Sequence, residues 1–366
     1  MTLLTFSVVK IFTLSTASLI LALIWCPVLT RYLYKHKLWK KEARSKAISG
    51  EEAPVFNSLH KDREVTVPRF GGLLIWVTAV LIIFIFYVVS LFFDGFWLGQ
   101  FNFLSRGQTW LPLFTLVVAS IVGLVDDILV VFGSSIKIFG KKILEFKGNY
   151  IGGGISFKRR LIIVILIGLI GGLWFYYKLG WSAIYIPLIG YITIGFWYVP
   201  LFIVVMLACW SGGVIDGLDG LAGGAFISIF GAFTIIALFQ GKTDLACFCA
   251  VIFGSLLAFL WFNIPPARFY MGETGILGLT TTIAVIAFLT DSIIVLPIIA
   301  GLLVLESGSV IIQLLSKKIR KKKIFLCSPL HHHFEAIGWP SYKVTMRFWI
   351  IGIVLAIIGT AIRLLG

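Results

Sequence analysis

The sequence predicts an all-α, multi-pass integral membrane protein. Hydrophobic residues make up 59% of its 366 positions and charged residues only 13%, whereas soluble domains carry roughly 25% charged residues. The mean hydropathy is +1.03, and apolar runs near the ~20 residues that cross a bilayer as one helix recur along the chain. We expect a single integral-membrane domain over residues 1–366, with loops and no separate soluble domain between its helices.

About ten apolar runs are expected to be membrane-spanning helices. The first is too long and too poorly flanked to be a cleaved signal peptide. The fifth is the least regular, because Gly180, Pro187, Gly190 and Pro200 interrupt its region. The runs lie at about 6–30, 70–93, 110–133, 161–178, 186–208, 222–240, 245–263, 275–291, 293–316 and 345–364.

The basic residues fall on alternate connections between these runs. Of 31 lysines and arginines, 26 lie in 31–69, 137–160 and 317–347 or at Arg268. Such an asymmetry marks the cytoplasmic loops of a membrane protein, so we expect both termini on the outer side. The net charge of +15 then indicates contact with anionic membrane lipid, and no nucleic acid partner is expected.

The first polar feature lies where a basic loop enters the second run, at Val67-Pro68-Arg69-Phe70-Gly71-Gly72. Proline and paired glycines at a helix entrance are typical turn residues. By itself this segment indicates only a turn.

Two adjacent carboxylates, Asp126 and Asp127, follow at the predicted cytoplasmic end of the third run. Adjacent side chains on a helix point about 100° apart, so these two cannot both avoid the protein interior. Two unpaired charges this close repel each other unless a cation lies beside them. A structural salt bridge is the alternative, but the next basic residue along the chain is Lys137. We therefore favour a bound cation or a role in proton transfer.

The most telling polar stretch is Asp216-Gly217-Leu218-Asp219-Gly220, which carries two carboxylates three residues apart in apolar surroundings. Ionised carboxylates at a bilayer are costly unless something cationic or aqueous compensates them. A metal ion or a polar substrate would do so, and the two glycines would let the backbone approach such a ligand closely. A plain polar loop between two helices is the alternative.

A third cluster runs from Asn263 to Gly275. Two prolines end the preceding helix, and Glu273 begins the next one, where the helix dipole also favours a carboxylate as a simple cap. Tyr270 offers an aromatic face on which a nucleobase could stack. Aromatic residues at a membrane interface are also commonly anchors.

The fourth cluster holds three consecutive histidines, His331, His332 and His333, followed by Phe334 and Glu335. The three imidazoles lack the i, i+4 spacing of a helical zinc site, which argues against zinc. Donors to phosphate or sugar oxygens suit them better.

All four clusters fall on the predicted cytoplasmic side, although the helix assignment and the charge bias were derived without them. They therefore indicate one site. Its oxygen ligands select a hard cation such as Mg²⁺ or Mn²⁺, which normally acts on phosphate. Basic and imidazole side chains around it would neutralise charge during phosphoryl transfer, with one substrate from the cytosol and the other from the bilayer.

At these residues the chain resembles the bacterial phospho-N-acetylmuramoyl-pentapeptide-transferases, a branch of the polyprenyl-phosphate N-acetylhexosamine-1-phosphate transferases. The resemblance covers nearly the whole chain. The acidic motifs are shared by the wider superfamily, whereas Pro-Leu-His-His-His-Phe-Glu at 329–335 is specific to the muramoyl-peptide branch.

The resemblance implies a ten-helix enzyme of the bacterial cytoplasmic (inner) membrane whose site faces the cytoplasm. It would move phospho-N-acetylmuramoyl-pentapeptide from UDP-MurNAc-pentapeptide to undecaprenyl phosphate with Mg²⁺, giving lipid I and UMP for peptidoglycan synthesis. Members of the family are often dimeric, so a homodimer is one expected assembly.

The same resemblance implies roles for single residues. Asp126 and Asp127 would activate the lipid phosphate or help to hold substrate. Glu306, at membrane depth, would either line the groove for the lipid chain or form a structural pair. The remaining implied roles are magnesium binding by Asp216 and Glu273, a uracil pocket formed by Gly217, Leu218, Asp219 and the stacking Tyr270, and contact with the nucleotide-sugar diphosphate by Asn263, His331, His333 and the catalytic His332.

Several positions depart from the family pattern. Glu273 replaces the usual aspartate, and its extra methylene could shift a metal ligand by about 1 Å, enough to affect the rate. Trp210 and Gly213 stand where asparagines are usual before Asp216. The lysine usual after the aspartate pair is missing, and its role could fall partly to the basic residues 158–160.

Two other functions fit part of this pattern. A sister transferase that uses UDP-N-acetylglucosamine would share the acidic loops but not the triple histidine. A secondary transporter also uses intramembrane carboxylates, but they would lie near the middle of the membrane and not at one rim.

Overall fold

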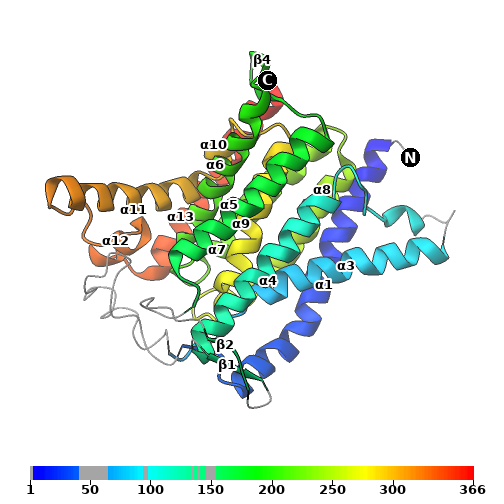
Figure 1. Cartoon of the computed structure of the whole chain (residues 1–366). Helices are drawn as coiled ribbons and strands as arrows, with labels where there is room; N and C mark the ends of the chain where they lie inside the picture. The colour runs from blue at the N-terminus through cyan, green and yellow to red at the C-terminus, as the bar shows by residue number, and fades with distance from the viewer. Residues whose placement is uncertain (1–2, 41–64, 94–97, 134, 139–140, 146–153) are drawn as a thin grey trace.

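Helices make up most of the structure, a computed structural model that describes residues 3–40, 65–93, 98–133, 135–138, 141–145 and 154–366. Most of the predicted basic loop at 31–69, namely 41–64, lies outside these described residues. The long helices are α1 (Leu3–Lys35), α3 (Gly72–Phe92), α4 (Trp110–Phe132), α5 (Phe157–Leu173), α6 (Tyr198–Ser211), α7 (Leu221–Phe239), α8 (Thr243–Asn263), α9 (Gly272–Leu289), α11 (Gly301–Arg320) and α13 (Ser341–Leu365), as Figure 1 shows.

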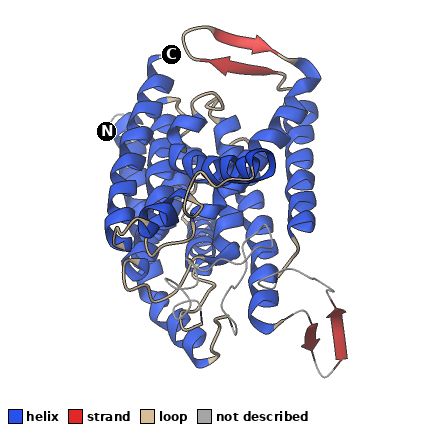
Figure 2. Ribbon diagram, turned by 90° about the vertical axis from the view of Figure 1, so that its left-hand side faces the viewer, coloured by secondary structure: helices blue, strands red, loops and turns tan. Residues whose placement is uncertain are grey.

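Short elements connect the long helices. Two antiparallel hairpins, β1–β2 and β3–β4, lie at opposite ends of the bundle (Figure 2). The short elements are η1 (Gly99–Phe101), β1 (Ser135–Ile138), β2 (Lys141–Glu145), η2 (Trp174–Lys178), β3 (Ala183–Ile186), β4 (Gly190–Thr193), η3 (Gly195–Trp197), η4 (Gly212–Ile215), α10 (Leu296–Ile299) and α12 (Leu330–Ala336).

Nine helices within the described ranges are long and apolar enough to cross a membrane. They are α1, α3, α4, α5 with its continuation to Lys178, α6 with the turns around it over Gly195–Ile215, α7, α8, α9 and α13. The predicted class, an all-α multi-pass membrane protein, is therefore confirmed.

The predicted helix at 186–208 begins later than expected. Its first residues form the β3–β4 hairpin, in which Ile186 pairs with Gly190 across a turn where Leu188 and Gly190 both have positive φ. A helix cannot continue through such a turn, and α6 starts only after it. Pro200 lies in the first turn of α6, where proline is tolerated.

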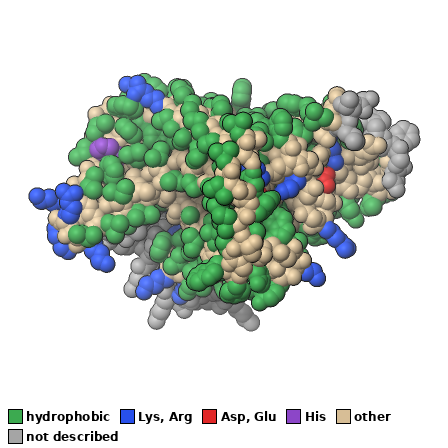
Figure 3. All heavy atoms as spheres, turned by 90° about the horizontal axis from the view of Figure 1, so that it is seen from above, with side chains coloured by type: hydrophobic (Ala, Val, Ile, Leu, Met, Phe, Trp, Pro, Cys, Tyr) green, Lys and Arg blue, Asp and Glu red, His purple; other side chains and the backbone are tan. Residues whose placement is uncertain are grey.

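The predicted helix at 293–316 is divided into α10 and α11, and α11 leaves the bundle sideways (Figure 1). It is not among the nine apolar helices, because one face is polar and its last turn is basic. That polar face is buried at Glu306, Ser309 and Gln313, whereas Ile312 and Leu315 on the other face are exposed. Figure 3 shows basic side chains at the left edge of the molecule, where α11 ends, beside a largely hydrophobic surface.

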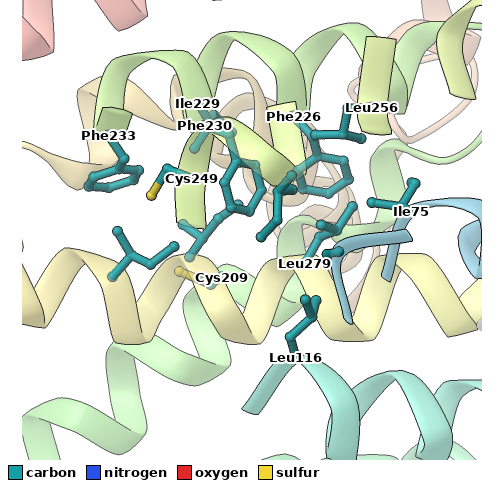
Figure 4. Close-up of a cluster of buried hydrophobic side chains, with 14 of the residues drawn as sticks. Ile75, Leu116, Cys209, Phe226, Ile229, Phe230, Phe233, Cys249, Leu256 and Leu279 are labelled. Atoms are coloured by element: carbon teal, nitrogen blue, oxygen red, sulfur yellow. The ribbon is translucent and has the colours of Figure 1, made fainter. Parts of the chain in front are cut away.

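Helix α9 lies at the centre of the bundle, with 94% of its apolar segment buried. Figure 4 shows Leu279 of α9 within the core, near Phe226 and Phe230 of α7. Gly123 of α4 faces the start of α9 so closely that an added Cβ would overlap the carbonyl oxygen of Glu273. Small residues allow this close crossing, and it fixes the carboxylates of α4 beside the first turn of α9.

Both chain termini lie at one end of the bundle, at the top of Figure 1, and β1–β2 lies at the other end. The arrangement agrees with the prediction that the termini share one side. The polar clusters of the sequence lie at the lower end, where α4 and α8 finish and α9 begins.

Candidate active site

Asp127 is fully buried near the end of α4 and binds two donors from other segments. Its Oδ2 accepts a hydrogen bond from the backbone N–H of Thr274 at 2.9 Å, and its Oδ1 accepts one from Nε of Arg69 at 3.0 Å. A structural salt bridge was the alternative left open for the aspartate pair, and Arg69 forms it with Asp127. The partner precedes α3, 58 residues upstream, where no local sequence pattern reveals it.

Asp126 binds the segment that leads into α5. Its Oδ1 accepts a hydrogen bond from the backbone N–H of Ile155, and its Oδ2 lies 3.8 Å from Nη1 of Arg160. The same Nη1 of Arg160 forms an ion pair with Oε1 of Glu273 in the first turn of α9. Arg160 therefore joins α4, α5 and α9 at one point.

Asp216 follows η4 and lies on the same side of the bundle as this pair. Its Oδ2 accepts a hydrogen bond from the backbone N–H of Gly272 at 3.3 Å. Burial raises the pKa of Asp216 to about 6, and the positive charge of Arg69 limits the rise. Burial alone would lower the pKa of Arg69, but the charges of Asp127, Asp216 and Glu273 raise it above its ordinary value. The three carboxylates thus lie close enough to act on one guanidinium.

The rest of the Asp216–Gly220 turn is held by the segment that follows α8. Oδ2 of Asp219 accepts a hydrogen bond from the backbone N–H of Ala267 at 3.1 Å. Asn263 accepts one from the N–H of Gly220 at 3.0 Å and donates one to the carbonyl of Phe269 at 2.8 Å. Asp219 and Asn263 thus position this turn in the structure, and Leu218 within it is buried.

The buried imidazoles of His331 and His332 lie over the backbone of Gly217. Nδ1 of His331 is 2.8 Å from Oε2 of Glu306, and Nδ1 of His332 is 2.8 Å from Oε2 of Glu335. A Cβ added at Gly217 would overlap Nε2 of His331 and would lie 3.1 Å from Nε2 of His332. Both rings therefore direct Nε2 toward the residue beside Asp216, and only glycine leaves room for them there.

Two other predicted site residues face different surroundings. His333 accepts a hydrogen bond from the backbone N–H of Leu326 at 3.3 Å and contacts the ring of Phe325. Tyr270 is half-buried, and its backbone N–H donates to the carbonyl of Pro68 at 2.8 Å. Neither residue is placed against the Gly217 backbone by these contacts.

Two carboxylates that orient the imidazoles extend the predicted set. Glu306 forms the structural pair that was one of its two readings, and Glu335 stands in the histidine motif without a role assigned from sequence. Among the described residues, the buried Oε1 of Glu306 and Nε2 of His331 have no hydrogen-bond partner. Buried polar atoms are usually satisfied, so a ligand or water is expected there.

The donor chemistry of the cluster suits a hard cation. Asp127, Asp216 and Glu273 supply carboxylate oxygens, which Mg²⁺ prefers, and all three act on Arg69. Across the described part of the chain, no group of three histidine, cysteine, aspartate or glutamate side chains is arranged to hold a metal ion. Arg69 and Arg160 pair with two of the three carboxylates in this arrangement.

Comparison with known proteins gives the class and then the family. A profile of glycosyl transferase family 4 matches residues 109–291, which include the α4, α6–α7 and α8–α9 parts of the site. The chain is 38% identical to the phospho-N-acetylmuramoyl-pentapeptide-transferase of a Geobacillus species over 70% of its length and 75% of that protein. It is 32% identical to the enzyme of that name from Lactiplantibacillus plantarum over 85% and 87%, and 34% to that from Pelagibacter ubique over 82% and 81%.

The fold and these matches define an integral membrane transferase of glycosyl transferase family 4. Within that class, the chain belongs to the phospho-N-acetylmuramoyl-pentapeptide-transferase family.

Proposed function

We propose that the protein transfers phospho-N-acetylmuramoyl-pentapeptide from UDP-MurNAc-pentapeptide to undecaprenyl phosphate, forming lipid I and UMP in peptidoglycan synthesis. The relatives named above support the reaction. The observation that carries it in the structure is the meeting of α4, the Asp216 turn and the first turn of α9, whose backbone N–H groups bind Asp127 and Asp216. Carboxylates, arginines and imidazoles so arranged suit the transfer of a phosphoryl group between two oxygens.

The aspartates differ in what they can do. Asp127 is bound by Arg69 and Thr274, so it is suited to orient this arginine and α9. Asp126 is bound by Ile155 and Arg160, so it is suited to hold the end of α4 against the start of α5. Activation of the lipid phosphate by either aspartate would require one of these donors to move.

Magnesium would be held by Asp216 and Glu273. When bound, the ion would neutralise charge on the phosphates of the donor substrate. Glu273 is paired with Arg160 in this structure, so binding of the ion by Glu273 would compete with this ion pair. Removal of the divalent ion is expected to stop the reaction.

His331 and His332 would bind the nucleotide-sugar through Nε2, because Glu306 and Glu335 occupy their Nδ1 atoms. Gly217, Leu218, Asp219 and Tyr270 remain the proposed uracil pocket. Asn263 would act through the turn it positions. We place the whole chain, as one domain, in the bacterial cytoplasmic membrane with this site facing the cytoplasm, and a homodimer as its expected assembly.

The experiment that tests this function uses the purified protein in lipid vesicles with undecaprenyl phosphate. UDP-MurNAc-pentapeptide and UDP-N-acetylglucosamine are supplied in separate reactions, with magnesium or with EDTA, and lipid product and UMP are measured. We expect product from UDP-MurNAc-pentapeptide alone, and only with magnesium. Product from UDP-N-acetylglucosamine alone would identify the sister transferase, and an unchanged rate in EDTA would exclude the metal.

A further inference from the structure

We propose that Arg69 binds a phosphate group of a substrate through its terminal guanidinium nitrogens while its Nε holds Asp127. This proposal rests on the proposed function and adds a substrate-binding residue to it. By itself, the residue pattern at Pro68–Gly72 predicted only a turn.

The backbone of this segment is fixed to the start of α9. The N–H of Tyr270 donates to the carbonyl of Pro68 at 2.8 Å, and the N–H groups of Gly71 and Gly72 donate to the carbonyls of Tyr270 and Met271 at 2.8 Å each. These three hydrogen bonds run in both directions between two segments about 200 residues apart in the chain. The loop is therefore held in place by the same residues that lead to Glu273.

The Pro68–Gly72 loop has an unusual backbone conformation that packing against neighbouring segments imposes. Phe70 has a φ of +74°, a region that residues with a Cβ rarely adopt, and its side chain is buried. Gly72 approaches the backbone of Gly275 so closely that a Cβ would overlap it. Backbone conformations of this kind are strained and persist where packing imposes them, often at functional sites. Here the result is that Arg69 is directed at the carboxylates.

The guanidinium has more donors than the structure uses. An arginine carries five N–H donors, and among the described residues its one hydrogen bond is from Nε to Asp127. The side chain is 19% exposed, whereas that of Asp127 is 0% exposed. Arg69 therefore has one edge on a buried carboxylate and another edge available to the site.

A second anion fits this available edge. Guanidinium groups bind carboxylate and phosphate through paired N–H donors, and they stay charged at all physiological pH values. The negative charges around Arg69 would repel a phosphate if no cation stood among them. A purely structural ion pair with Asp127 would need Nε alone, and would leave the terminal nitrogens without a function.

The test compares phosphorylated ligands with their phosphate-free forms. Calorimetry measures binding of UMP and uridine, and of undecaprenyl phosphate and undecaprenol, to wild type, Arg69→Gln and Arg69→Lys. Because a hydrogen bond to a charged group contributes about 1.5–3 kcal/mol, we expect Arg69→Gln to weaken one phosphorylated ligand about 10- to 100-fold. Its phosphate-free form should bind as before. Loss for UMP assigns the nucleotide phosphate, and loss for undecaprenyl phosphate assigns the lipid phosphate.

Arg320→Gln, at the exposed end of α11, is the matched control and should bind every ligand as wild type does. Arg69→Lys keeps a positive charge beside Asp127 and serves as the folded variant if Arg69→Gln does not fold. It should recover stability but only part of the phosphate affinity. The proposal is overturned if Arg69→Lys binds like wild type, or if phosphorylated and phosphate-free ligands weaken together. Wild type that releases no UMP from UDP-MurNAc-pentapeptide would instead count against the proposed function.

Discussion

At the scale of single residues, the site depends on the negative charge of Asp216, whose side chain is half-buried. Burial raises the pKa of Asp216 to about 6 from its ordinary value of 3.8. In the unfolded chain this carboxyl loses its proton near pH 4, whereas the folded protein keeps it until about pH 6. Above pH 6 the carboxyl is ionised in both states, and the ionised form is more favourable in the unfolded chain. The contribution of Asp216 to the free energy of unfolding therefore falls as the pH rises from 4 to 6.

Replacing Asp216 with asparagine should stabilise the folded protein above pH 6. The amide retains an acceptor for the N–H of Gly272 and carries no charge, so we expect a gain of about 1–3 kcal/mol at pH 8. The gain should shrink toward pH 4.5, where wild-type Asp216 is itself protonated. Thermal unfolding in magnesium-free detergent at both pH values measures it. A gain that is equal at both pH values, or larger at the lower one, would show that folding does not raise the pKa of Asp216.

The ion pairs at the site show what sequence reasoning could not provide at this scale. The residue types were predicted, including Asp126, Asp127, Asp216 and Glu273. Their partners were not, because Arg69 is separated from Asp127 by 58 positions and Arg160 from Glu273 by 113. Only the tertiary packing of α3, α4, α5 and α9 decides which charges meet.

At the scale of elements, α11 and α12 place two imidazoles against the turn between η4 and α7. Glu306 of α11 orients His331, and Glu335 of α12 orients His332, so both Nε2 atoms approach Gly217. The sideways course of α11 is what brings its buried polar face to the histidines. The apolar pattern predicted a straight membrane-spanning helix over 293–316. Such a helix gives no reason to expect that Glu306 contacts His331.

A methyl group at Gly217 should push the two imidazoles from the site. The Gly217→Ala variant has an allowed backbone conformation, since φ of this residue is not positive, but its Cβ would overlap Nε2 of His331. We expect UMP release to fall by at least about tenfold, since displacements near 1 Å can cost more than that. Steady-state UMP release measures the effect. Gly308→Ala in α11, where a Cβ meets nothing within 4 Å, is the control, and equal rates in the two variants would contradict this placement of the histidines.

Element prediction worked where the apolar pattern alone decides the structure. The runs at 222–240 and 245–263 correspond to α7 and α8 within a few residues. The pattern was insufficient at 186–208, where a hairpin turn with positive φ at Leu188 and Gly190 replaces the start of a helix. Apolar β-strand residues and apolar helix residues look alike in a short run.

At the scale of the whole molecule, the charge asymmetry of the loops predicted that the polar clusters share one rim of the bundle. The termini lie at the opposite end of the bundle from β1–β2 (Figure 1), as the basic loops indicated. Centrally buried α9 connects the two ends and carries Glu273 at the rim. The fold class and the common side of the four clusters were therefore predictable, while the α4–α9 crossing that joins them depends on close packing at Gly123.

This orientation predicts which residues are accessible from each side of the membrane. In a protein that carries Cys327→Ser, the cysteine of a second substitution, Lys321→Cys, should react with a membrane-impermeant maleimide only in inside-out vesicles. A cysteine in place of the exposed Arg106, between α3 and α4, should react only in right-side-out vesicles. The reverse labelling pattern would place the site on the outer face and exclude a cytosolic nucleotide-sugar donor.

The central claim is that residues from distant segments form one phosphoryl-transfer site. Its most direct test follows radiolabelled UDP-MurNAc-pentapeptide in vesicles that contain undecaprenyl phosphate and either wild type, Asp127→Asn or Asp216→Asn. We predict that label passes to the lipid phase with an equal amount of UMP in wild type, and that both variants fold but transfer none. Wild-type rates in either variant, or no transfer by wild type, would contradict the account.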